Sequence, residues 1–507
     1  MDKQPLWNRV FRVLACAAAL GVLADLLLKV GPWGLNAALW TAAFAVAVWV
    51  LSRDSDTIMP KNRRWCVPLI ALFGVMLSWW DAPMLKLLNI AVIFLLCATL
   101  VLRPDVKSLL RTGFLNYAVA LIDGALGVVA GLPSMVTTDV PRQVRGIRND
   151  MDDSQSVLLR RHAWSVSIGM LISFPLLLIF GALFTSADTA FRAWVSEIFH
   201  LNWEVLIEHA FTIGITSWVT AGYLYAAFLK RQMASSPESA LQGVRLDALA
   251  ILIPLGSLIA LFGAFIAMQI PYFFGGNAVV QTESGPSYAT YAREGFFQLV
   301  AVAALALCVL LVADWLGRDA SPRGRRALHS FTAILVALVF VVMASALHRM
   351  ALYTSAYGLT TLRFYTTAFM LWLAGALAWF LLVVIKGRRE RFLFPALALA
   401  CVFVTVFNFI NPERIIVEVN ASRTDSVEAL DIEYLLRLSN DAAPALVALL
   451  DRLPEREREH LRSALVQRID FDPEDARVQY SQRLDIGGWR AWSWSRQRAY
   501  EAISRIR

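Results

Sequence analysis

The chain has 507 residues, of which 58% are hydrophobic and 17% are charged, and its formal net charge is +8. A soluble domain of average composition carries about a quarter charged residues, so this composition excludes an ordinary soluble globular protein. The long apolar segments do not alternate with polar residues, which excludes a transmembrane β-barrel.

Long apolar segments recur over residues 1–411 and predict an all-α, polytopic transmembrane bundle, because helices satisfy every backbone polar group inside lipid. A segment of about 20 residues suffices to cross a ~30 Å hydrocarbon core. We expect about eleven spans, near residues 10–29, 34–52, 65–80, 84–102, 164–186, 205–229, 247–270, 295–316, 328–347, 367–386 and 392–411. The first segment lacks a small-residue cleavage site and runs into the next, so we expect a retained helix rather than a cleaved signal peptide.

Lysine and arginine alternate between the connections and predict the orientation of the chain. The N-terminus and one set of connections hold 26 basic residues, and the opposite set holds 6. Cytoplasmic loops are the basic ones, so we expect a cytoplasmic N-terminus, a basic cytoplasmic loop over 138–163 and an external C-terminus. The basic character is thus explained by topology, and we expect no nucleic-acid partner.

One apolar segment, 114–131, does not fit this alternation. It contains Asp123 and three glycines, and basic residues flank it on both sides. A single crossing here would invert every later connection. We therefore predict an interfacial or re-entrant segment.

Residues 412–507 change in character, with 15 basic and 17 acidic residues and no apolar run long enough to span. Prolines 444 and 454 stand where helices begin, and we expect three or four packed helices forming a small soluble domain. Near its end, Trp489, Trp492 and Arg496 follow i, i+3, i+7 spacing and are predicted to share a helical face. That face either docks a partner protein or belongs to the domain's own core.

Sequence motifs of well-known enzymes are missing from the chain. It contains no GxxxxGK[ST], HExxH or GxSxG pattern and no cysteine or histidine pairs at zinc-ligand spacing. We therefore predict no catalytic residues, no cofactor and no metal, and we expect the protein not to be an enzyme. The five cysteines are interpreted as small buried hydrophobes.

The stretch His348–Thr366 lies between two apolar segments, on the predicted outer face. Arg349, Tyr353 and Tyr357 follow i, i+4, i+8 spacing, which aligns them on one side of a helix. A glycine then lets the chain leave that helix, and Thr360 or Thr361 can cap the next one.

Arg363 lies in the first turn of that next helix, so two guanidinium groups and two phenols are expected around one turn. Guanidinium groups bind phosphate and carboxylate bidentately, which favours an anionic lipid or other anionic envelope material as ligand. The alternative is that these side chains only anchor the helix ends at the membrane surface.

Ionisable residues within or beside the spans form a second set of candidates, because an unpaired charge in a bilayer costs several kcal/mol. They are Asp25, Glu208, His209, Asp314 and His329. A contact between Asp314 and His329 across a short connection is expected. Either a proton pathway or buried structural pairs would explain these groups.

The chain resembles a family of bacterial multi-spanning membrane proteins catalogued as a domain of unknown function. The resemblance rests on the pattern RMxLYxxxYGLTxxR, from Arg349 to Arg363, and on NPxxxI, at Asn411, Pro412 and Ile416. It implies a protein of the bacterial inner membrane and supports the outer Arg/Tyr turn as a feature that the family shares. It implies no activity.

Three functions follow from these observations. The first is a protein that binds or senses anionic lipid or envelope material at the outer Arg/Tyr turn, with membrane lipids and a possible protein partner at the C-terminal domain. The second is a secondary transporter that uses the intramembrane Asp, Glu and His residues. The third is a membrane transferase acting on a lipid-linked substrate.

Overall fold

The structure is a computed structural model. It describes residues 6–29, 32–53, 64–101, 121–122, 124–129, 131, 203–228, 248–274, 296–317, 320–388, 391–423, 430–470, 484 and 488–507. The predicted segment 114–131 falls only partly within these ranges. The basic loop 138–163 and the predicted span 164–186 lie outside the described residues.

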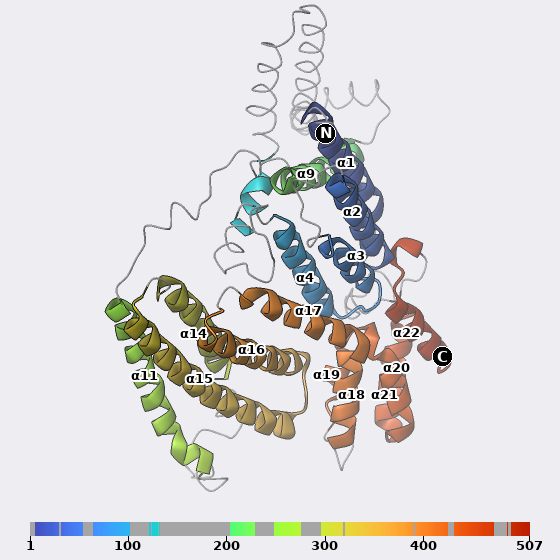
Figure 1. Cartoon of the computed structure of the whole chain (residues 1–507). Helices are drawn as coiled ribbons and strands as arrows, with labels where there is room; N and C mark the ends of the chain where they lie inside the picture. The colour runs from blue at the N-terminus through green and yellow to red at the C-terminus, as the bar shows by residue number, and fades with distance from the viewer. Residues whose placement is uncertain are drawn as a thin grey trace, which may run out of the picture.

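The N-terminal helices form a first bundle with its own apolar core (Figure 1). They are α1 (Leu6–Leu28), α2 (Leu35–Arg53), α3 (Cys66–Met76), α4 (Pro83–Val101) and α9 (Trp203–Phe228). Helices α1 and α9 approach closely at Gly21, where a Cβ atom would stand 2.0 Å from the Ser217 Oγ. Glycine at this position therefore allows the two helices to pack.

A second bundle has a separate apolar core, and α17 joins the two bundles. Its helices are α11 (Ala248–Phe274), α14 (Phe296–Leu316), α15 (Pro322–Tyr357), α16 (Thr361–Ile385) and α17 (Leu393–Ile410). In α17, Ala396 packs in the second core and Val404 in the first. Figure 1 shows α17 lying between α4 and α16.

Large apolar side chains point outward from both bundles. Phe94 is 69% exposed and Ile253 is 67% exposed, although both lie within candidate membrane spans. Soluble monomers rarely expose apolar patches of this extent. The outward side chains instead suit hydrocarbon, which supports the prediction of a multi-pass membrane protein.

Eight of the helices that the structure describes are long and apolar enough to cross a membrane. Helix α15 has 36 residues, about 54 Å at 1.5 Å per residue, so it extends beyond the predicted span 328–347. Helix α3 has only 11 residues, and the predicted span 65–80 is therefore not a full-length helix. Helix α9, over the predicted span 205–229, is not among the eight. The total of eleven spans stays a prediction.

The C-terminal region, residues 412–507, is a cluster of short helices around a third core. They are α18 (Pro412–Arg423), α19 (Ile432–Leu436), η8 (Asn440–Ala442), α20 (Ala443–Leu449), η9 (Leu450–Arg452), α21 (Glu455–Gln467), η10 (Trp489–Ala491) and α22 (Trp494–Ser504). Prolines 444 and 454 stand at helix starts, as expected.

The prediction of one helical face through Trp489, Trp492 and Arg496 is wrong. The chain changes from η10 to α22 at Ser493, whose side chain caps α22. Because the segment is not one continuous helix, i, i+3, i+7 spacing does not align its side chains. Arg496 is buried, whereas Trp489 is 59% exposed.

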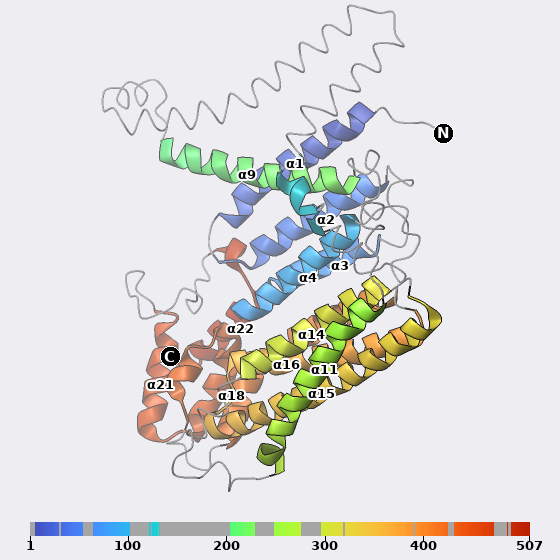
Figure 2. The same ribbon diagram turned by 90° about the vertical axis from the view of Figure 1, so that its left-hand side faces the viewer.

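The C-terminal region lies at one end of the bundles, opposite the start of α1 (Figure 2). Three connections reach it there: Leu35 donates its N–H to the Trp492 carbonyl, Asp81 contacts Arg496, and the Thr361 N–H donates to the Tyr434 hydroxyl. The residues before α2, the α3–α4 connection and the α15–α16 turn therefore lie at the same end as the C-terminal region. Which membrane face this end occupies stays a prediction.

Candidate functional site

The α15–α16 turn has the local structure that its sequence predicts. Gly358 follows the last residue of α15 with φ 79° and ψ 168°, a conformation that residues with a Cβ rarely adopt. Thr360 then caps α16, its hydroxyl accepting from the Arg363 N–H at 3.4 Å. The turn thus brings Arg363 back toward the end of α15.

The turn brings three of the four predicted ligand-binding residues together. Arg363 donates from Nη1 to the carbonyls of Tyr357, at 3.2 Å, and of Gly358. Its guanidinium carbon lies 3.9 Å from the centre of the Tyr353 ring, and the Tyr353 and Tyr357 rings are 5.2 Å apart. Arg349 lies half-buried one helical turn before Tyr353 on α15.

Residues of the C-terminal region hold this turn, and sequence reasoning missed them. Asn420 accepts from the Leu359 N–H at 2.6 Å and donates to the Leu359 carbonyl at 2.9 Å. The Tyr434 hydroxyl accepts from the Thr361 N–H at 2.7 Å, and Arg423 donates to the Ser355 carbonyl. These contacts join residues more than 60 positions apart, so no local pattern could indicate them.

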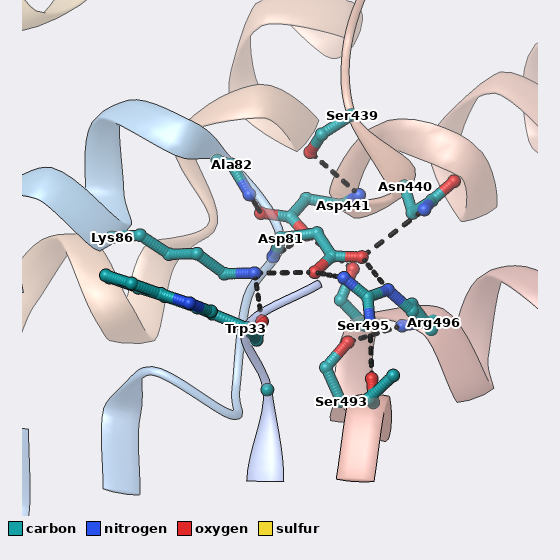
Figure 3. Close-up of polar contacts among 12 residues, drawn as sticks. Trp33, Asp81, Ala82, Lys86, Ser439, Asn440, Asp441, Ser493, Ser495 and Arg496 are labelled. Atoms are coloured by element: carbon teal, nitrogen blue, oxygen red, sulfur yellow. Dashed lines mark hydrogen bonds and ion pairs between the residues drawn. The ribbon is translucent and has the colours of Figure 1, made fainter. Parts of the chain in front are cut away.

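A buried polar junction (Asp81, Lys86, Asp441, Ser495 and Arg496) joins the C-terminal region to the α3–α4 connection (Figure 3). The Arg496 Nε and Nη2 atoms lie 2.7 and 2.8 Å from the two Asp81 carboxylate oxygens. Lys86 Nζ lies 2.9 Å from Asp81 Oδ1. Asp81 and Arg496 are 4% exposed, so this is a buried, bidentate ion pair, whose strength depends on full pairing.

Asp441, in the C-terminal region, binds the backbone of the α3–α4 connection in the same junction. Its carboxylate accepts from the N–H groups of Asp81, at 2.7 Å, and Ala82, at 2.9 Å, and from the Ser495 hydroxyl. Burial raises the pKa of Asp441 to about 6, and the adjacent Asp81 carboxylate adds to this effect. The C-terminal region thus caps the start of α4 with a carboxylate whose pKa is raised by burial.

A further buried carboxyl group, Glu413, lies inside the C-terminal region. Its Oε2 accepts from the Ser439 N–H at 2.8 Å and the Ser439 hydroxyl at 2.6 Å. Burial raises the pKa of Glu413 to about 8, and the negative charge of Asp441 contributes. Burial lowers the pKa of Arg468, which faces Glu413, to about 10.

The structure brings Asp25, Glu208 and His209 together between α1 and α9. His209 Nδ1 lies 2.6 Å from Asp25 Oδ2, and Lys29 Nζ lies 3.2 Å from Glu208. Asp25 is 8% exposed, and its Oδ1 atom has no hydrogen-bond partner within the part of the chain that is described. A buried carboxylate oxygen of this kind has spare capacity to accept a proton or a donor.

Asp314 and His329 line one small cavity at the end of the second bundle that lies away from the α15–α16 turn. Arg325 and Thr332 line the same cavity. The cavity has room for about one water molecule. The structure therefore brings these two predicted residues to the same place. Their direct contact stays a prediction.

The described residues contain no group of three or more His, Cys, Asp or Glu side chains that could hold a metal ion. The five cysteines are free thiols.

A family model described as a domain of unknown function (DUF4153) matches residues 67–449, more than half of the chain. The match includes Asp81, the α15–α16 turn and Asp441, and it ends before Arg496. No curated protein and no solved structure matches the chain.

Proposed function

The chain belongs to the DUF4153 family, and from this premise we propose that it is a bacterial inner-membrane protein that binds an anionic headgroup at the α15–α16 turn. We place this turn at the periplasmic face of the membrane as part of the proposal. In this proposal, the C-terminal region, which holds the turn through Asn420 and Tyr434, responds when a headgroup binds at the turn.

Two half-buried guanidinium groups lie at the turn, and the groups that accept their hydrogen bonds are uncharged carbonyls. Arg363 and Arg423 both donate to carbonyl groups near the end of α15. Neither forms an ion pair with a carboxylate among the residues that the structure describes. An anion would offer these donors the charge-assisted bonds that carbonyl groups do not.

The neighbouring side chains suit a headgroup at a membrane surface. Tyr357 is 53% exposed, and its ring packs beside Tyr353, which Arg363 overlies. Tyrosine at such a boundary presents an apolar ring to lipid and a hydroxyl to water. The site therefore favours a phosphate attached to a lipid over a free anion.

The experiment is lipid retention during purification in a mild detergent, measured by native mass spectrometry. Arg363→Gln and Arg423→Gln should each reduce retained acidic phospholipid about tenfold, since a lost charged hydrogen bond costs about 1.5–3 kcal/mol. Arg414→Gln is the matched control, because Arg414 lies on the same helix as Arg423 but pairs with Glu418 in solvent. Unchanged retention in the Arg363→Gln/Arg423→Gln double variant would overturn the proposal. An added free-phosphate arm that displaces the lipid would point to a soluble anion as the ligand instead.

A second candidate function, secondary transport, is favoured by the Asp25–His209 pair. An intramembrane carboxylate with one unpartnered oxygen beside an imidazole is suited to accept and release a proton. In proteoliposomes, Asp25→Asn should abolish uptake driven by a pH gradient, whereas Asp451→Asn, at an exposed position of the C-terminal region, should leave it intact. Uptake that persists in Asp25→Asn would exclude this pair from transport.

A further inference from the structure

The tryptophan segment, residues 489–494, exposes three large aromatic side chains beside the ends of membrane helices. Trp489 is 59%, Trp492 39% and Trp494 46% exposed. Trp33, two residues before the start of α2, is 46% exposed and adds to the same boundary. These tryptophans do not belong to the three apolar cores described above. They are also separate from the α15–α16 turn, where we propose that a headgroup binds.

Backbone hydrogen bonds fix the height of the tryptophan segment relative to the spans. Leu35, the first residue of the candidate span α2, donates its N–H to the Trp492 carbonyl at 2.8 Å. Trp494 donates its backbone N–H to the Ser78 carbonyl at 2.9 Å. A Cβ on Gly34 would lie 2.4 Å from the Trp492 oxygen, so the two backbones are in direct contact. The segment is therefore level with the start of α2.

The buried junction makes this placement rigid. Arg496, two residues after Trp494, is paired with Asp81 inside the protein, and Ser495 donates its N–H to the Trp79 carbonyl at 3.0 Å. Trp79 packs edge-on against Phe409 at the end of α17, with ring centres 5.8 Å apart, and Phe409 is 65% exposed. The aromatic boundary thus continues from α2 to the end of a second candidate span.

The charge of the segment is opposite to that of the surrounding region. Residues 486–500 contain three arginines and no acidic residue, although residues 412–507 have more acidic than basic residues overall. Arg496 is neutralised by Asp81, while Arg498 is exposed one helical turn after Trp494 on α22. Tryptophan with arginine is the composition that partitions to the lipid headgroup layer.

We propose that the tryptophan segment is an interfacial membrane anchor, which holds the C-terminal region against the bilayer with Trp489, Trp492 and Trp494 in the headgroup layer. The partner is the lipid surface itself. Since tryptophan binds this layer through its amphipathic ring, the anchor does not need acidic lipid. It therefore differs from the anion site proposed at the α15–α16 turn.

The test is site-directed spin labelling of the full chain in vesicles of phosphatidylcholine alone. Cysteines at positions 489 and 492 (Trp489→Cys, Trp492→Cys) are compared with Glu455→Cys, a position whose side chain is 84% exposed on α21. The background carries Cys308→Ser, because Cys308 is the exposed native thiol, and is itself labelled as the blank. Collisions with oxygen should exceed collisions with a water-soluble nickel chelate at 489 and 492, and the order should reverse at 455.

A nickel accessibility at positions 489 and 492 equal to that at 455 would overturn the anchor. Trp494→Cys is a third position in the segment, so one poorly tolerated label does not decide the result. Because the vesicles contain no acidic lipid, failure of the anchor is distinguishable from failure of the anion site. A label shielded from both reagents would also overturn it, since it would place the tryptophans against protein.

Discussion

Arg496 shows how one buried side chain can hold two parts of a membrane protein together. It meets both oxygens of Asp81, which also receives Lys86. A buried ion pair adds little over an apolar pair of equal shape, yet removing one partner leaves an uncompensated charge. The junction therefore specifies where the C-terminal region docks.

Replacing Arg496 by Gln should destabilise the protein by about 3 kcal/mol, the lower part of the range for broken buried pairs, because Lys86 still faces Asp81. The measurement is the free energy of unfolding in detergent, together with the rate of trypsin cleavage in the C-terminal region. Arg414→Gln, which breaks an exposed pair, should cost less than about 1 kcal/mol. Equal effects of the two substitutions would contradict a docking role for Arg496.

Glu413 gives the stability of the protein a defined pH dependence. Burial raises its pKa from 4.5 to about 8, so the folded state favours the protonated carboxyl group. The unfolded chain releases this proton near pH 4.5, which means that the stabilising contribution is complete below that pH and is lost as the pH rises through about 8. Asp441, whose pKa is also raised, changes stability in the same direction.

Unfolding temperatures measured from pH 4.5 to 8 should therefore fall as the pH rises in the wild type. Glu413→Gln keeps an oxygen that can accept from Ser439 but cannot titrate. The wild type should lose on the order of 3 kcal/mol of unfolding free energy between the ends of this pH range. The profile of Glu413→Gln should be flatter. A wild-type profile that rises over this interval would show that the carboxyl group is ionised in the folded protein.

Among the elements, the α15–α16 turn depends on one backbone conformation and one close contact. Gly358 has a positive φ, and a Cβ at this position would lie 2.9 Å from Asn420 Oδ1. Asn420 is also the residue that pairs with both backbone groups of Leu359. Strain at Gly358 would therefore reach the contact between the α15–α16 turn and α18.

Gly358→Ala should cost about 1–3 kcal/mol in unfolding free energy, from the strained conformation and the displaced Asn420. Gly387→Ala is the control, because Gly387 also has a positive φ, 62°, but no atom of the described residues packed around it lies within 4 Å of its added Cβ. It should cost about 1–2 kcal/mol. A larger loss at Gly387 than at Gly358 would show that the Asn420 contact does not restrict the turn.

At the scale of the whole molecule, two bundles joined by α17 carry the C-terminal region at one end (Figures 1 and 2). The connections that contact this region are those with few basic residues, and Lys386 and Arg388 lie at the other end of α16. For these described connections, the end of the bundle on which each lies agrees with its basic-residue content, and the membrane face of each end stays a prediction.

Labelling with a membrane-impermeant maleimide in intact spheroplasts tests the orientation. Tyr357→Cys and Glu455→Cys should react from the outside, and Arg388→Cys only after the membrane is opened. Reaction of all three in the opposite sense would reverse the orientation and leave the fold intact. Reaction of Tyr357→Cys and Glu455→Cys from opposite sides would contradict the placement of the C-terminal region.

The sequence alone determined the class of protein, the family and the local structure of the α15–α16 turn. These depend on patterns within one segment: the length of an apolar run, a glycine that leaves a helix, a threonine that caps the next. The family match confirms the family that the motif from Arg349 to Arg363 indicated. The described helices likewise confirm the all-α membrane bundle.

Only the tertiary structure decided which polar groups meet. Asp81 and Arg496 are 415 positions apart, and Asn420 reaches Leu359 from another helix, so their pairing follows from the docking of whole elements. The break at Ser493, which turns Arg496 inward and the tryptophans outward, likewise depends on the backbone contacts with Leu35 and Ser78. Burial, which raises the pKa of Asp441 and Glu413, exists only after these elements have packed together.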